Sequence, residues 1–141
     1  MTPFGAQPAF RLEVEVRPPE ALDPVSGGPV RLVSITGGRV SGAIAGVILP
    51  GGTDWQTLGP DGTIGIEARY LLELNDGTRV ELQSRGRRSG QAGGFWSTIW
   101  LNCTNPAHAH LNGAQFLAWG VKADRGVEIA AYALPESGAQ A

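Results

Sequence analysis

Residues 50–86 read PGGTDWQTLGPDGTIGIEARYLLELNDGTRVELQSRG, and this stretch predicts the β-hairpin around which the rest of the chain is organised. Every second position from Ile64 to Leu74 is apolar, which is the period of a strand with one buried face. The next three residues, 75–77, are Asn-Asp-Gly and tolerate the positive φ of a tight turn. The chain is therefore expected to reverse there and to return as a strand over 78–84.

Outside this hairpin, short apolar runs separated by turn residues predict further strands. The clearest is 9–16, where Phe10, Leu12 and Val14 alternate with charged residues. The other expected elements are strands at 30–36, 39–49, 95–103, 112–122 and 127–134, a bend at Gly37-Gly38, and loops at 17–29 and 85–94. The pattern predicts an all-β fold of about eight mostly antiparallel strands in a closed barrel, because closure removes exposed edges. A two-sheet β-sandwich is the alternative.

Length and composition predict one folded domain over 1–141, with a loose N-terminal arm at 1–8 and a frayed C-terminal tail at 135–141. Of the 141 residues, 42% are hydrophobic and 17% charged, and the net charge is −2. A chain with so little positive charge is not expected to bind nucleic acid. No apolar run is long enough to cross a membrane and no secretory signal is visible, so the cytoplasm is the expected location.

Several segments of the chain resemble the bacterial family labelled domain of unknown function 3237. The family pattern combines a PGG-[AT]-DW turn, an acid-Ala-Arg strand, a DDG-type hairpin, an arginine-glycine element and a WLN tripeptide. The matching stretches here are 50–55, 61–63, 67–69, 75–77, 85–86 and 110–112, together with Phe95. The resemblance implies a small β-barrel similar to the calycin and allene-oxide-cyclase type, with a ligand-sized interior and no settled activity. Glu67 stands where the family has aspartate, and His110 where it has tryptophan.

Glu67 and Arg69 are the first candidates for chemistry. They lie two residues apart on an expected strand and must share a face. If that face lines the barrel, the acid could transfer a proton while Arg69 stabilises a developing oxyanion. If the apolar face is the inner one, the two form a solvated surface pair of little energetic value. Periodicity slightly favours the surface pair, whereas the family motif favours the cavity.

His110 is the rival acid–base group, because imidazole titrates near physiological pH. His108 lies two residues away, and such a pair can bind a metal ion in an extended segment, but no third ligand is signalled. No metal or other cofactor is therefore expected. Asn112 could orient a substrate carbonyl.

Aromatic and turn residues complete the candidate site. Asp54 and Trp55 follow a glycine-rich turn, which predicts either a turn-capping aspartate beside a core tryptophan or a pair at the barrel mouth. Tyr70 and Trp100 are expected to form pocket walls.

The sequence thus predicts a cofactor-independent lyase, isomerase or cyclase that acts by acid–base catalysis on a small carbonyl-bearing molecule inside the barrel. A non-catalytic, lipocalin-type small-molecule binding protein is the alternative. A third possibility is an assembly subunit whose aromatic strands form the interface of a homodimer or other homo-oligomer. An enzyme needs two ionisable groups that converge in one cavity, whereas a carrier needs one polar anchor in an apolar barrel.

Overall fold

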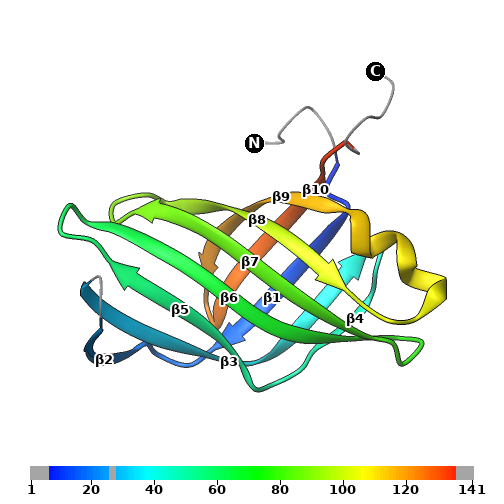
Figure 1. Cartoon of the computed structure of the whole chain (residues 1–141), viewed down its shortest axis with the longest axis horizontal. Helices are drawn as coiled ribbons and strands as arrows, with labels where there is room; N and C mark the ends of the chain where they lie inside the picture. The colour runs from blue at the N-terminus through cyan, green and yellow to red at the C-terminus, as the bar shows by residue number, and fades with distance from the viewer. Residues whose placement is uncertain (1–6, 26–27, 136–141) are drawn as a thin grey trace.

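The computed structural model describes residues 7–25 and 28–135, and these form a closed antiparallel β-barrel (Figure 1). The elements in chain order are β1 (Phe10–Val16), β2 (Glu20–Val25), β3 (Gly28–Gly42), β4 (Gly46–Ile48), β5 (Gly52–Leu58), β6 (Thr63–Leu74), β7 (Arg79–Ser89), β8 (Gly94–Asn102), the 3-10 helix η2 (Pro106–Gly113), β9 (Gln115–Ala123) and β10 (Gly126–Ala133). The predicted closed barrel is confirmed, and the sandwich alternative is not what the chain forms.

Closure comes from the two neighbours of β1. Strands follow the order β1-β10-β9-β8-β7-β6-β4-β3, and β3 pairs back onto β1. The short strands β4 and β5 lie one after the other between β3 and β6, so that they share one position in the wall. Strand β2 pairs with the N-terminal part of β3. The wall therefore has eight positions and is built from ten strands.

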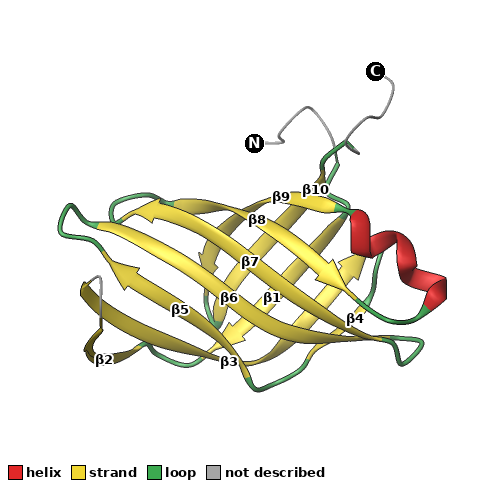
Figure 2. Cartoon of the chain, viewed as in Figure 1, coloured by secondary structure: helices red, strands yellow, loops and turns green. Residues whose placement is uncertain are grey.

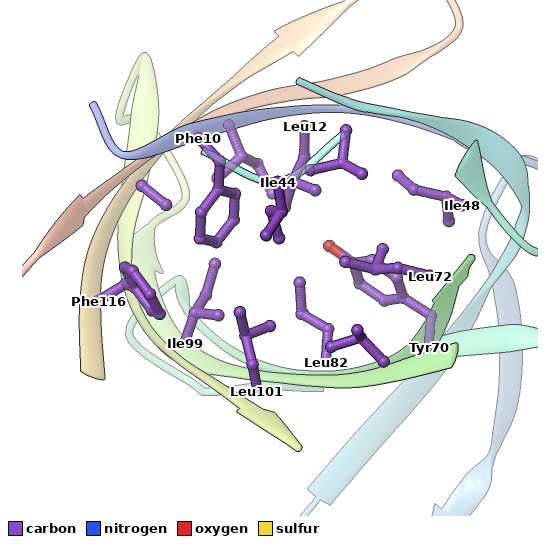
Figure 3. Close-up of a cluster of buried hydrophobic side chains, with 14 of the residues drawn as sticks. Phe10, Leu12, Ile44, Ile48, Tyr70, Leu72, Leu82, Ile99, Leu101 and Phe116 are labelled. Atoms are coloured by element: carbon purple, nitrogen blue, oxygen red, sulfur yellow. The ribbon is translucent and has the colours of Figure 1, made fainter. Parts of the chain in front are cut away.

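The apolar face of the central hairpin lines the inside of the barrel (Figure 3). Tyr70 on β6 lies opposite Leu82 on β7, which lies opposite Leu101 on β8. All three side chains are at most 4% exposed. Farther round the wall, the rings of Phe10 and Phe116 meet edge to face with their centroids 4.9 Å apart. Alternation with a period of two thus decides which side chains form the core.

Helix η2 covers one end of the barrel, where it is the single red element in Figure 2. The side chain of Asn105 caps it by accepting a hydrogen bond from the backbone N–H of Ala107 at 3.0 Å. Leu111 is only 5% exposed and joins the apolar core. Among the described residues, no helix has the length and apolar character needed to cross a membrane.

The predicted hairpin turn at 75–77 is confirmed. The backbone N–H of Gly77 donates to the carbonyl of Leu74 at 2.8 Å, and Gly77 has a φ of 87°. Positive φ at this position is the reason that glycine is suited to it.

Other boundaries differ from the expectations for physical reasons. The expected loop at 17–29 contains β2, which pairs with β3 at 20–22 and at Val25, so its prolines lie outside the paired positions. The expected bend at Gly37-Gly38 lies within β3, where a Cβ on Gly38 would collide with the carbonyl oxygen of Glu13 on β1. The expected turn residues 54–55 lie in β5, and β7 extends through the first half of the expected loop at 85–94. Most of the expected arm and tail, residues 1–6 and 136–141, lies outside the described residues.

Replacing Leu82 by alanine should lower the free energy of unfolding by about 2–5 kcal/mol, because its side chain is 0% exposed inside the barrel. Leu71→Ala is the matched control, since Leu71 lies on the neighbouring strand, faces outward and is 42% exposed. Its cost should stay below about 1 kcal/mol. Urea denaturation measures both, and equal losses for the two variants would show that the inward and outward faces are assigned wrongly.

Candidate functional site

Glu67 and Arg69 lie on the outer surface of the barrel. Their side chains are 61% and 69% exposed, because the alternate positions of β6 form the core. The guanidinium of Arg69 binds one carboxylate oxygen of Glu81 at 2.9 and 2.6 Å. Glu67 lies 3.8 Å from Arg85. The solvated surface pair, which the sequence left open, is the arrangement found, and neither residue lines the interior.

Three more residues of the predicted site also lie away from the interior. Trp55 is 38% exposed and lies beside Glu67 on the outer face, while Trp100 lies opposite Gln83 on the same outer surface. Asn112 accepts a hydrogen bond from the backbone N–H of Cys103 at 2.8 Å and donates to its carbonyl at 3.0 Å. That side chain holds the connection between β8 and η2.

The two histidines lie on η2 rather than on the expected extended segment, and the centroids of their rings are 6.5 Å apart. His110 is exposed at the closed end of the barrel. His108 lies 2.7 Å from a carboxylate oxygen of Asp76 and ties the helix to the β6–β7 turn. The hydrogen bond to His108 and the backbone N–H of Thr78 lower the pKa of Asp76 to about 2. No group of three or more potential metal-binding His, Cys, Asp and Glu side chains occurs within the described ranges.

Asp54 and Tyr70 are the two predicted site residues that point into the barrel. Asp54 lies opposite Val33 on β3 and Ala68 on β6, both of which belong to the inward face. Tyr70 is 4% exposed, and its hydroxyl points toward the middle of the barrel (Figure 3). The structure therefore brings together one acid and one phenol from the set that the sequence proposed.

A chain of hydrogen bonds holds one oxygen of Asp54 in place. The Nε of Arg31 donates to Oε1 of Gln56 at 2.6 Å, and Nε2 of Gln56 donates to Oδ2 of Asp54 at 2.7 Å. Gln56 is 8% exposed, which shields these bonds from water. These two hydrogen bonds fix the orientation of the carboxylate.

Two buried oxygens next to this chain have no hydrogen-bond partner within the described part of the protein. They are Oδ1 of Asp54 and the hydroxyl oxygen of Tyr70. Leaving a buried polar group unpaired costs about 1–3 kcal/mol, so proteins seldom keep one without a reason. These two oxygens are therefore the polar atoms of the interior whose hydrogen-bonding capacity the described residues leave unused.

The electrostatics of the two groups differ from those of exposed side chains. Burial raises the pKa of Asp54, and this effect outweighs the opposing effects of the hydrogen bond from Gln56, the nearby Glu67 backbone and the charges of Arg31 and Arg88. Burial, assisted by the charge of Asp54, also raises the pKa of Tyr70, which keeps its hydroxyl protonated at all physiological pH values.

Polar and small side chains continue around this level of the barrel. Ser84 lies opposite Ala68 and donates to the hydroxyl oxygen of Ser97 at 3.0 Å. Arg88 also lies on the inward face of β7, opposite Ile64. It is four residues farther along the strand than Ser84, toward the end of the barrel that η2 does not cover. We define the interior polar half by Arg31, Asp54, Gln56, Tyr70, Ser84, Arg88 and Ser97.

Two surface depressions of about 490 and 270 Å³ lie elsewhere, around the outer side of β1.

Sequence reasoning missed Arg31, Gln56 and Arg88. The alternation of Gly52, Asp54 and Gln56 could have placed Asp54 and Gln56 on one face of a strand, but this segment was expected to be a turn. No local pattern joins Arg31 to Gln56, because the two residues lie 25 positions apart.

Comparison with known proteins finds one matching family. The pattern of the family described as "Protein of unknown function (DUF3237)" matches residues 4–134. A UPF0311 protein of Bradyrhizobium diazoefficiens is 43% identical over 63 residues, which cover 45% of this chain and 41% of the relative. A UPF0311 protein of Rhodopseudomonas palustris is 33% identical over 92 residues, covering 64% of this chain and 60% of the relative. The matched stretches thus span about half the length of these relatives.

Solved structures share the barrel. A beta-barrel like protein from Acinetobacter baumannii is 28% identical with a TM-score of 0.84, covering 92% of this chain and 94% of that one. A structure described as an enzyme from Penicillium herquei is 21% identical with a TM-score of 0.65, covering 93% and 98%. At that identity the second likeness concerns the fold alone.

Replacing Asp54 by asparagine should stabilise the fold at neutral pH. The raised pKa means that the folded state favours the protonated carboxyl, so the wild type loses stability as the pH rises from 3.8 through the folded pKa. Asparagine does not titrate and keeps an acceptor for Gln56. The advantage of the variant in free energy of unfolding should therefore grow with pH, as measured by urea denaturation at several pH values.

Asp61→Asn is the control of opposite sign. The backbone N–H of Thr63 lowers the pKa of exposed Asp61, so its contribution is present above pH 3.8 and is lost on acidification. This variant should be less stable than wild type at neutral pH. A D54N protein whose stability parallels that of wild type at every pH would contradict the burial of a titrating Asp54.

Proposed function

The chain belongs to the DUF3237 family of proteins of unknown function, and we propose that it is a cofactor-independent enzyme that transfers a proton on a small carbonyl-bearing molecule in the interior polar half. The observation that carries this proposal is the pair of buried, unpartnered oxygens on Asp54 and Tyr70 within the described part of the chain. One belongs to a group that exchanges a proton and the other to a group that donates a hydrogen bond. Lyase, isomerase and cyclase reactions all need that combination.

Asp54 is the acid–base group in this proposal. Its Oδ2 is occupied by Gln56, which leaves Oδ1 to remove a proton from the carbon beside the substrate carbonyl. Burial raises the pKa of Asp54, and a carboxylate with a raised pKa is a stronger base than an exposed one. The proton that Asp54 accepts is later returned to the substrate, so no cofactor is consumed.

Tyr70 and the interior arginines stabilise the negative charge that forms. The neutral hydroxyl of Tyr70 donates a hydrogen bond to the enolate oxygen, and Arg31 and Arg88 supply positive charge to the same half of the barrel. Returning the proton to another atom completes an isomerisation. Attack by the enolate carbon on an electrophilic carbon of the same substrate closes a ring, and the oxygen that gains the electron pair takes the proton from Asp54. Expulsion of a leaving group from the β-carbon, with that proton passing to the leaving group, gives a lyase reaction.

A lipocalin-type carrier is the second candidate function. Arg31 and Arg88 outnumber the carboxylate of Asp54 in the interior polar half, which favours a ligand with a negative charge. In a carrier these groups hold the ligand without proton transfer.

Proton exchange in D₂O distinguishes these functions with a panel of test compounds in place of the natural substrate. The wild-type protein is incubated with β-diketones and β-keto acids, and replacement of C–H by C–D is followed by NMR. We expect at least one compound to exchange faster with the protein than in buffer alone, loss of that acceleration in D54N, and a decrease of about 10²-fold in the acceleration in Tyr70→Phe. Glu67→Gln is the matched control, because that carboxylate lies outside the barrel, and it should exchange as wild type does.

Two results would contradict the proposal. Exchange that D54N accelerates as much as wild type does would exclude Asp54 as the base. Compounds that bind the wild type, as seen by ligand-line broadening, but never exchange would favour the carrier.

A further inference from the structure

The outer surface of β8 and β9 carries no charged side chain and gathers three of the chain's four tryptophans. Its outward side chains form what we call the tryptophan face, defined by Trp96, Thr98, Trp100, Leu117, Trp119 and Val121. The rings of Trp96 and Trp119 lie in contact, with centroids 4.8 Å apart. The outer surface of β6 and β7, by contrast, carries ion pairs such as Arg69 with Glu81 and Arg79 with Glu73.

Two charged residues border this face on opposite sides. Arg87 on β7 lies opposite Trp96. Glu128 on β10 lies opposite Val121, one outward position from Trp119. Within the described ranges neither side chain is close enough to an opposite charge to form an ion pair, whereas Arg85 and Glu13 nearby do have partners. The two borders are three strand spacings apart, roughly 14 Å.

This arrangement is complementary to itself. A two-fold axis that runs parallel to the strands between β8 and β9 places Trp96 of one copy against Trp119 of the other. The same rotation exchanges the two borders and brings each Arg87 level with Ala130 of the other copy, one outward position along β10 from Glu128. An arginine side chain is long enough to span that offset of roughly 7 Å. Interfaces with two-fold symmetry require this kind of self-complementary patch, and their centres are rich in aromatic residues and poor in charge.

A depression beside the tryptophan face can receive the arginine. It measures about 270 Å³, and its charged lining residues are Glu13, Glu128 and Arg11, with Trp119 beside them. Glu13 is already paired with Arg39, so Glu128 is the carboxylate that an arginine side chain from a facing copy would meet there. Arginine and tryptophan are the residues that most often dominate the binding energy of protein interfaces.

We propose that the tryptophan face binds a second copy of this chain and forms a two-fold symmetric dimer in which Arg87 of each copy pairs with Glu128 of the other. The dimer is independent of the chemistry inside the barrel, because every side chain involved points outward.

Sedimentation velocity of the full chain over a range of concentrations tests the dimer. We expect wild type to dimerise, and Arg87→Glu to raise the dissociation constant about tenfold or more by placing two carboxylates together. Glu128→Arg alone should weaken the dimer in the same way. The double variant with both substitutions restores opposite charges and should restore dimerisation. Arg17→Glu makes the same charge change at an exposed position outside the face and should have no effect.

Three outcomes would overturn the proposal. The first is a wild-type chain that stays monomeric at submillimolar concentration, which would leave the face to a different partner. The second is an oligomer that Arg87→Glu leaves intact. The third is a double variant that associates no better than the single variants. Circular dichroism of each variant shows whether a loss of association reflects unfolding.

Discussion

The pairing of β1 with both β3 and β10 is the constraint on which the rest of the structure depends. It turns an open sheet into a barrel, and from then on each strand must direct alternate side chains inward. The close pairing requires glycine, since a Cβ on Gly38 or Gly126 would collide with carbonyl oxygens of β1. Phe10, Leu12 and Val14 then complete the core from the inner face of that strand.

Closure also explains why the interior has two chemically different halves. The half near η2 is filled by apolar side chains, with Leu111 of the helix among them. The other half holds charged and hydroxyl groups that a closed wall keeps away from bulk water. Burying Asp54 there is unfavourable unless it is paired, and the chain from Arg31 through Gln56 pairs one of its oxygens. The oxygen that remains is the reason for proposing chemistry at this place.

Local alternation was enough to predict the barrel and its central hairpin, including the turn at 75–77. Alternation also slightly favoured the outward position of Glu67 and Arg69. The expectation that they line the cavity came from the family motif. The site itself could not be predicted from local patterns, because Arg31, Asp54 and Tyr70 come from three strands, and their relative positions depend on the register of strand pairing. Asp54 and Tyr70 entered the predicted set, but the partner that holds the acid did not.

The protonation of Asp54 in the folded protein is the most direct test of this account. Carbon-detected NMR of protein labelled at its aspartate carboxyl groups follows each side chain through a pH titration, and the spectrum of D54N assigns the signal. The account predicts that Asp54 titrates above 3.8, the ordinary value for aspartate, while Asp61 and Asp76 titrate below it. If Asp54 instead titrates together with those exposed carboxyl groups, it does not lie in the interior polar half, and the proposed chemistry has no base.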